Sequence, residues 1–437
     1  MVIIMKAINL KTEYLVNPMG IDIQNPRLMW NCEGGITQTA YRIVAKMDEK
    51  IIWDSGKVNS SSMHAEYPLP LLSRERIEWN VTLWDENDFE GKHSQTAFFE
   101  MGLLSTNDFV AKWISGNYCI NKKKRYPVDC FKKQFNVKSV EKARLYITAC
   151  GLYEAMINGK RVGSFVLAPG HTDYTKRIQL QTYDVTELLK NGENEITVEL
   201  ADGWYRGSCG AWGRKNQYGT QTKLYAQLEI TDKFGNRSMV GTNETWKWSN
   251  DGKIRFADNK DGEVVQAWQV PSYIGFAKET KCNVMPVPSN NVPIIEHERF
   301  SVKNVITTPS GAKVLDFGQN IAGYISFAIP AKKGQKIKLR FGEMFDENGE
   351  FTQKNIQCAN KKRTKVTPLQ QIEYYCKDGL NDYKTKFAIF GFQYVLIETD
   401  VKWEKKSFTA IAVYSDMEET LSFDSSNKLL NKLVEAT

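Results

Sequence analysis

The sequence predicts a mostly β protein, built as tandem β-sandwiches and ending in the start of a helix. Apolar and polar residues alternate with a period of two, for example at Leu145/Ile147/Ala149 and Ile325/Phe327/Ile329, as they do in half-buried strands. Tight-turn dipeptides such as Asn158-Gly159 and Asn348-Gly349 punctuate these segments. Short strands with frequent turns favour antiparallel sandwiches or barrels over a parallel α/β sheet.

Length and composition exclude several classes of protein. The chain has 437 residues, which predicts about three domains. Its net charge of +7 is diffuse, and the dense basic run at 122–125 is typical of a solvated loop, so we expect no nucleic-acid partner. No apolar run approaches the ~20 residues that cross a bilayer, so we expect no membrane partner either.

Four segments follow from the strand pattern and from a proline-rich connector that includes Pro271, Pro286, Pro288 and Pro293. Residues 1–108 have the size and the tryptophan-bearing strands of a fibronectin III- or immunoglobulin-like sandwich. Residues 109–285 form a second β-domain, and residues 286–415 form a third β-sandwich. Residues 416–437 are a linker and a first helix, in which Leu429 and Leu433 share a face and Ser425-Ser426 provides the cap.

The cysteine and histidine content limits metal chemistry and indicates a cellular location. The eight Cys include no C-x-x-C pair, which argues against a structural zinc site, and there are only four His. Scattered cysteines fit reduced thiols in the cytoplasm. The start of the chain, residues 1–6, has too short an apolar stretch and no basic lead for a signal peptide, which agrees with a cytoplasmic location.

The second block contains the candidate binding residues. Its order of strands and turns resembles the galactose-binding-like jelly rolls attached to many glycosidases, in which rim loops present aromatic rings to the apolar faces of sugars and polar groups to their hydroxyls. The predicted carbohydrate-binding residues are Asn158, Asp202, Trp204, Tyr205, Arg206 and Trp212. A turn role explains Asn158 more simply. The glycines beside Trp204 indicate a loop that is either exposed or closely approached by other backbone.

Motifs along nearly the whole chain resemble the N-terminal β-domains of bacterial α-L-rhamnosidases. Each motif alone is weak, but they occur in the family's order. They are Trp53-Asp54-Ser55-Gly56, Leu167-Ala168-Pro169-Gly170, Gly203-Trp204-Tyr205-Arg206-Gly207, Asp261-Gly262-Glu263, Asp316-Phe317-Gly318-Gln319-Asn320 and Phe390-Gly391-Phe392-Gln393-Tyr394. His171 stands where the family often has an aromatic residue.

The resemblance implies hydrolysis of terminal α-L-rhamnose from glycosides, with inversion. That reaction needs two carboxyl groups roughly 6.5–9.5 Å apart, and the family carries them on an (α/α)6 barrel that follows the β-domains. No stretch of this sequence matches the family's catalytic acidic motif. We therefore assign no catalytic residue, expect the barrel to be missing from the chain, and expect the chain alone to be inactive. Its expected partners are rhamnose-containing glycosides and that barrel.

Two alternatives remain open from the sequence. Some family members use calcium in the second module, but Asp173, Asp202 and Asp261 are separated in sequence and define no ligand set, so we expect no cofactor beyond that possible calcium ion. The chain is either the non-catalytic portion of a rhamnosidase or a stand-alone rhamnose-binding module without hydrolase activity. In the second case the loops at Trp204 and Trp212 would hold the sugar, and Arg206 would read its polar side.

Overall fold

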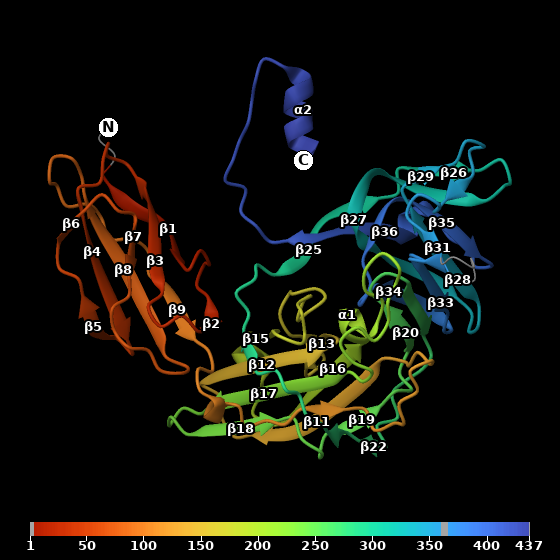
Figure 1. The fold of residues 1–437 in the computed structure, drawn as a ribbon, viewed down its shortest axis with the longest axis horizontal. Helices are drawn as coiled ribbons and strands as arrows, with labels where there is room; N and C mark the ends of the chain where they lie inside the picture. Colours follow the sequence, from red (N-terminus) through yellow and green to blue (C-terminus); the bar gives the residue numbers. More distant parts are fainter. Residues whose placement is uncertain (1–3, 360–365, 437) are drawn as a thin grey trace.

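The computed structural model describes residues 4–359 and 366–436 and confirms a mostly β architecture of tandem sandwiches (Figure 1). Three β-domains follow one another along the chain, and a short helix ends it. The first domain is joined to the second at one end only, whereas the second and third pack together more extensively. The second domain therefore borders both of the others.

The first domain is a two-sheet sandwich. Its smaller sheet has the order β1 (Lys6–Thr12), β3 (Arg27–Glu33), β7 (His64–Glu66). Its larger sheet has the order β2 (Met19–Ile21), β9 (Ala97–Met101), β8 (Arg76–Trp84), β4 (Ala40–Met47), β5 (Lys50–Asp54), with β6 (Val58–Asn59) also on β4. Trp30 and Trp79 are fully buried between the sheets. The tryptophan-bearing strands therefore supply the core, as their alternating pattern predicts.

The second domain is a larger two-sheet sandwich. One sheet has the order β23 (Lys278–Glu279), β10 (Ile114–Ser115), β17 (Lys223–Thr231), β12 (Lys142–Cys150), β15 (Ile178–Asp184), β24 (Pro286–Pro288), with β18 (Arg237–Gly241) on β17. The other has the order β14 (Lys160–Arg161), β13 (Leu152–Ile157), β16 (Gly192–Ala201), β11 (Asp129–Val137), β19 (Lys247–Ser249), β22 (Gly275–Phe276). The short helix α1 (Gly203–Arg206) follows β16.

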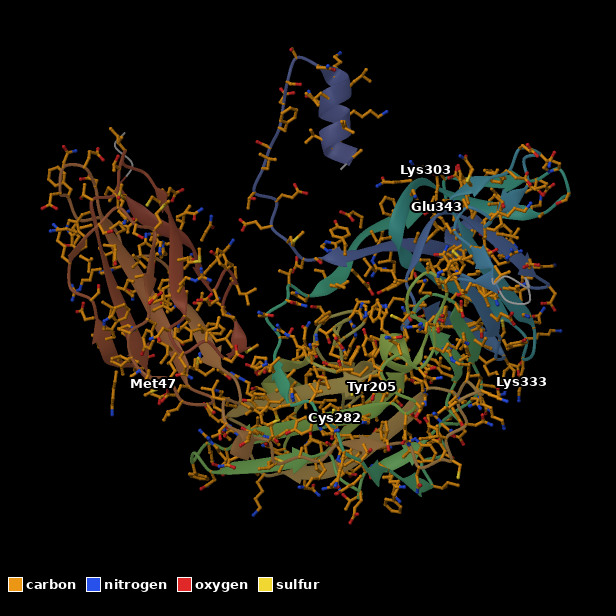
Figure 2. The ribbon with its side chains drawn as sticks, in the orientation of Figure 1. Met47, Tyr205, Cys282, Lys303, Lys333 and Glu343 are labelled. Carbon is orange, nitrogen blue, oxygen red and sulfur yellow. The ribbon has the colours of Figure 1, made fainter. Side chains whose placement is uncertain are left out.

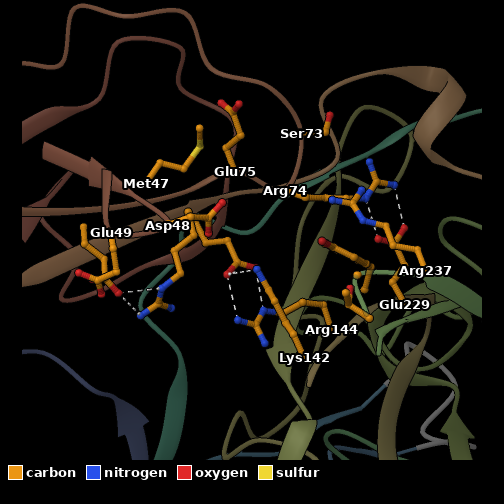
Figure 3. Close-up of a pocket in the computed structure, with 16 residues that line it drawn as sticks. Met47, Asp48, Glu49, Ser73, Arg74, Glu75, Lys142, Arg144, Glu229 and Arg237 are labelled. Carbon is orange, nitrogen blue, oxygen red and sulfur yellow. Dashed lines mark hydrogen bonds and ion pairs between the residues drawn. The ribbon is translucent and has the colours of Figure 1, made fainter. Parts of the chain in front are cut away.

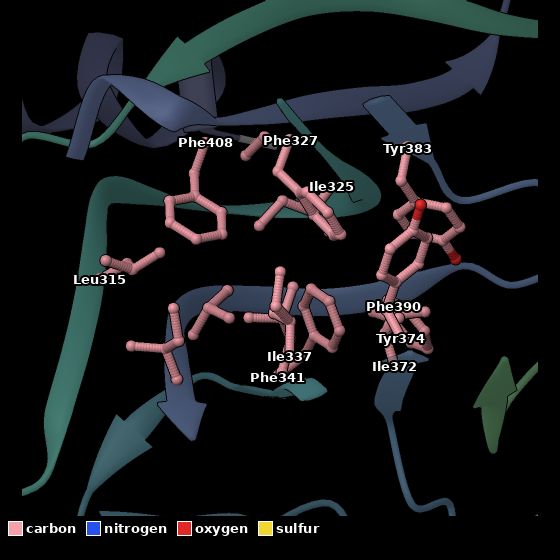
Figure 4. Packing of buried hydrophobic residues seen from close by; sticks show 14 of the residues in the cluster. Leu315, Ile325, Phe327, Ile337, Phe341, Ile372, Tyr374, Tyr383, Phe390 and Phe408 are labelled. Atoms are coloured by element: carbon pink, nitrogen blue, oxygen red, sulfur yellow. The ribbon is translucent and has the colours of Figure 1, made fainter. Parts of the chain in front are cut away.

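The third domain is organised by one large sheet. Its order is β20 (Ile254–Asp258), β21 (Gly262–Gln266), β33 (Gln371–Tyr375), β28 (Lys336–Gly342), β35 (Phe390–Thr399), β27 (Lys313–Ala331), β36 (Phe408–Ser415), β25 (Ile294–Ser301), with β26 (Asn304–Thr307) and β34 (Gly379–Lys384) on β27. Two small two-stranded sheets pair β29 (Met344–Phe345) with β30 (Phe351–Thr352) and β31 (Cys358–Ala359) with β32 (Val366–Thr367). Side chains such as Phe327, Phe341 and Phe390 fill its core (Figure 4).

The second and third domains exchange strands near the predicted boundary at residue 285. β20 and β21 precede residue 285 but join the sheet of the third domain, where β21 pairs in parallel with β33. β24 follows residue 285 but pairs in parallel with β15 of the second domain. The sheets therefore do not divide at one point in the sequence, because pairing between distant strands, which local alternation does not reveal, decides which sheet a strand joins.

One buried and one half-buried ion pair join the first domain to the second. Arg144 of β12 donates from Nε and Nη2 to the two carboxylate oxygens of Glu100 on β9, at 2.7 and 2.9 Å. Arg74 bonds Glu229 of β17 in the same bidentate way. Between these pairs lies a polar cavity of about 720 Å³ (Figure 3). Charge-assisted forks of this kind are directional, so they fix how the two sandwiches meet.

The chain ends in α2 (Lys428–Ala436), which stands apart from the three β-domains (Figure 1). The predicted helix is confirmed, but its cap differs from the prediction. Asn427, rather than Ser425-Ser426, accepts the free backbone N–H groups of Leu429 and Leu430 through Oδ1. Ser425 instead binds the Asn431 side chain at 2.6 Å. The side chain of Asn427 reaches the first turn because it immediately precedes the helix.

Candidate functional site

The candidate site is the rim of the second domain formed by the segment after β16, which carries Trp204 and Trp212. Gly203 has φ +52°, and a Cβ there would meet Leu152 Cγ at 2.6 Å, so only glycine fits where α1 begins. The glycines around Trp204 therefore mark close backbone packing, the second of the two explanations open from the sequence. Tyr205, the neighbour of Trp204, lies in the second domain (Figure 2).

A buried ion-pair network holds this segment. Arg206 Nε donates to Asp202 Oδ1 at 2.6 Å, and Arg125 bonds both Asp202, at 3.0 Å, and Asp258, at 2.8 Å. The Arg206 guanidinium also donates to Tyr118 Oη. Burial raises the pKa of Asp258, but Arg125 and backbone N–H groups more than offset this, and the net pKa is lowered. The two arginines, the two aspartates and Tyr118 therefore tie this segment together beneath the rim.

The aromatic residues of the rim differ in how much of each ring is free. Trp204 is half-buried, and His171 stacks on it with ring centroids 5.1 Å apart and planes 15° from parallel. Tyr218 approaches His171 from the edge at 6.5 Å. Burial lowers the pKa of His171, which favours the neutral ring at neutral pH. His171, where the family often has an aromatic residue, here supplies a flat ring of its own.

Trp212 lies at the tip of a tight turn. Cys209 and Arg214 exchange two backbone hydrogen bonds of 2.9 Å, which closes the loop and projects Trp212 outward, with 72% of its surface exposed. The turn contacts the third domain, because a Cβ on Gly213 would meet Thr367 at 2.9 Å. An exposed indole on an anchored turn is suited to stacking on a ligand.

The six residues predicted to bind carbohydrate do not form one cluster. Asn158 has φ +50° and sits in the turn between β13 and β14, where its side chain binds Leu188 O, Asn194 and the Glu195 amide. This turn lies beside the start of β16, whereas Trp204 follows the end of β16. At roughly 3.3 Å per residue, about 20 Å of strand therefore separates Asn158 from Trp204. Asn158 therefore acts as a turn residue.

Asp202, Tyr205 and Arg206 support the rim instead of facing solvent. All three are buried, with exposed fractions of 3, 7 and 4%. Arg206 is bonded to Asp202 and Tyr118 and is almost fully buried, so it presents no polar edge to a sugar at the surface. Of the predicted set, only Trp204 and Trp212 reach the surface of this rim. Sequence reasoning missed His171 and Tyr218 as ring partners, because only the folded chain brings these loops together.

Metal ligation was left open by the sequence. Across residues 4–359 and 366–436, no three His, Cys, Asp or Glu side chains gather as a metal site. Asp173 Oδ1 accepts a hydrogen bond from Thr175 Oγ1 at 2.6 Å. Asp261 Oδ1 accepts hydrogen bonds from the Thr367 hydroxyl and the Leu369 amide. Asp202 accepts hydrogen bonds from Arg206 and Arg125. Each of the three aspartates therefore binds different partners within the protein.

Two carboxylates do come close together where the second domain meets the third. Glu154 and Glu199 both bind Lys386 Nζ, at 2.5 and 2.7 Å, beside a cavity of about 300 Å³. Burial raises the pKa of Glu154, but the charge and hydrogen bond of Lys386 and the charges of Arg161 and Lys384 together outweigh it, and the net pKa is lowered. A general acid needs a raised pKa. Glu154, Glu199 and Lys386 therefore form a structural ion triad.

Comparisons with known proteins agree with the fold. Three family models match in chain order: the Rha78A-like N-terminal immunoglobulin domain at residues 7–105, the alpha-L-rhamnosidase N-terminal domain at residues 138–305, and the bacterial alpha-L-rhamnosidase concanavalin-like domain at residues 306–414.

No helix in the described part of the chain is long and apolar enough to cross a membrane.

Individual relatives carry the same description. An alpha-L-rhamnosidase of Formosa agariphila is 33% identical over 97% of this chain and 48% of its own length, and one of Alteromonas sp. is 32% identical over 97% and 49%. The crystal structure of the native rhamnosidase from Aspergillus terreus superposes with a TM-score of 0.89 at 31% identity, covering 99% of this chain and 51% of that one. The chain thus spans about half the length of the relatives it matches. With matching domains in matching order, the chain belongs to the α-L-rhamnosidase family, of which it represents the N-terminal β-domain portion.

Proposed function

We propose that this chain is the non-catalytic β-domain portion of an enzyme that hydrolyses terminal α-L-rhamnose from glycosides with inversion. The observation that carries the proposal is the 33% identity to an α-L-rhamnosidase over 97% of the chain. The Glu154–Glu199 pair supports the non-catalytic part, because Lys386 lies between its carboxylates, where the reaction requires a water molecule and a leaving oxygen. The free thiols support the cytoplasmic location that the sequence predicts.

The test is hydrolysis of p-nitrophenyl α-L-rhamnoside by the purified chain. We expect no p-nitrophenol above the enzyme-free rate, while a full-length family member run in parallel releases it. Release by the chain that persists through a further purification step, and is lost in Glu154→Gln, would refute the non-catalytic assignment and would identify the ion triad as the active site.

A second candidate function is rhamnose binding by the chain itself, favoured by the exposure of Trp212 on its anchored turn. The ring of Trp212 would stack on the apolar face and methyl group of the sugar, and the His171–Trp204 stack would provide a second flat surface. In this proposal Asp202, Tyr205 and Arg206 act beneath the rim, and Asn158 has no part.

Intrinsic tryptophan fluorescence titrated with L-rhamnose tests this second function. Binding at the rim predicts a saturable change at millimolar sugar that Trp212→Ala abolishes. Phe234→Ala is the matched control, because Phe234 is a similarly exposed aromatic residue, 76% exposed, on another turn of the same domain. No change in the unmodified chain, or equal loss in both variants, would contradict rim binding.

A further inference from the structure

Two free thiols lie in one packed cluster beneath the candidate rim. Cys150, the last residue of β12, is 1% exposed, and Cys282, in the connector after β23, is half-buried. Both side chains pack in one cluster with Tyr174 and Tyr205, and each perturbs the pKa of the other. Figure 2 shows Cys282 and Tyr205 in the second domain. The sequence gives no hint of this pairing, because the two cysteines are far apart along the chain.

Ordered backbone on both sides holds the two sulfur atoms together. Cys150 lies directly opposite Lys223 in the β12–β17 ladder, and the Nζ of Lys223 donates to the carbonyl oxygen of Lys281 at 2.7 Å. The thiol of Cys282 lies 3.7 Å from the carbonyl oxygen of Val284. Just before Cys282, β23 is paired with β10. The connector is therefore tied to the sheet that carries Cys150, near the end of β12.

We propose that Cys150 and Cys282 are a modification site: a dithiol that peroxides oxidise to a reversible disulfide. In the first step the Cys282 thiolate attacks a peroxide oxygen, the O–O bond breaks, and Cys282 sulfenic acid and hydroxide form. In the second step the sulfur of Cys150 attacks the sulfur of Cys282 and displaces the hydroxyl group as water. Overall, two thiols and one hydrogen peroxide give one disulfide and two waters, and a dithiol reductant reverses the reaction.

The surroundings assign different roles to the two cysteines. The hydrogen bond from Cys150 and the charge of Lys223 lower the pKa of Cys282, whose side chain also reaches solvent, so it is the thiol that meets the oxidant. Cys150 has a raised pKa and is buried, so it reacts only with the neighbouring sulfur. By contrast, burial raises the pKa of both Cys130 and Cys376, which makes them poor first targets.

The proposal extends beyond rhamnose chemistry and is tested without any sugar. The purified, fully reduced chain is treated with hydrogen peroxide, unreacted thiols are blocked with an alkylating agent, and the protein is digested with trypsin. We expect the peptide 145–160, which contains Cys150, to be linked to the peptide 282–299, which contains Cys282. Two of the eight thiols should become unavailable for alkylation in denaturant and should return after dithiothreitol treatment.

Two variants and one control make the result decisive. Cys282→Ser should abolish the linked peptide, and Cys150→Ser should instead accumulate a dimedone-reactive sulfenic acid at Cys282. Cys119→Ser, which removes an exposed thiol of the same domain, should leave the linked peptide unchanged. The proposal is overturned if Cys282 accumulates the dimedone adduct in the unmodified chain without forming the linked peptide. It is also overturned if Cys282 resists peroxide while Cys119 is oxidised, or if Cys282 pairs equally with several cysteines.

Discussion

Glu100→Gln removes one charge from the ion pair that docks the first domain on the second. Glu100 is 0% exposed and Arg144 is 6% exposed. The variant keeps the shape of the side chain, so it opens no cavity, but it leaves Arg144 facing a neutral amide at the 2.7 and 2.9 Å positions. Removing one partner of a buried pair costs about 3–5 kcal/mol.

The structure places the expected loss at the lower end of that range. Arg144 keeps a second carboxylate, because Asp184 lies 2.8 Å from its Nη1. We therefore expect a loss of about 3 kcal/mol in the free energy of unfolding. For domains of this size, each kcal/mol corresponds to a shift of about 2–4 °C, so scanning calorimetry should show the affected transition about 6–12 °C lower.

Glu78→Gln is the matched control. Glu78 lines the same interdomain cavity, but its side chain is 42% exposed and its contact with Arg76 is 3.4 Å long. We expect this variant to fall within about 0.5 kcal/mol of the unmodified chain, as is usual for exposed sites. Equal shifts for the two variants, or no shift for Glu100→Gln, would refute the conclusion that the buried pair holds the interface.

Three further predictions concern other contacts. Gly20→Ala should destabilise the chain by more than about 1 kcal/mol in urea unfolding, because Gly20 has φ +78° and a new Cβ would meet Thr182 Oγ1 at 2.2 Å; unchanged stability would contradict this close approach. Asp258→Asn should weaken the loss of stability at acidic pH. In the unmodified chain the lowered folded-state pKa of Asp258 contributes stability above the ordinary value of 3.8, and this contribution is lost as pH falls through the folded value. A loss of stability in the variant as steep as in the unmodified chain would contradict this. Lys386→Met leaves two half-buried carboxylates side by side, which raises their folded-state pKa values, so this variant should lose stability as pH rises through those values; a pH profile parallel to that of the unmodified chain would contradict the ion triad.

Local pattern predicted the mostly β class and individual strands, because alternation and turn chemistry act between near neighbours. The segment at Leu145, Ile147 and Ala149 lies in β12, and Asn158-Gly159 forms a tight turn with both φ values positive. The candidate site was predicted less completely. The sequence identified Trp204 and Trp212 as rim residues, but it did not show that Arg206 would be buried between Asp202 and Tyr118.

The sequence by itself determined the sandwich class, the family and the terminal helix, since each depends on residue order and short-range periodicity. Only the tertiary structure decided that β20 and β21 leave their sequence neighbours for the third domain's sheet, and that Lys386 bridges two glutamates of the second. The contact of Cys150 with Cys282 was decided in the same way. The physical reason is that strand partners and buried charge pairs are chosen by desolvation and geometry across distant segments, which no local pattern records.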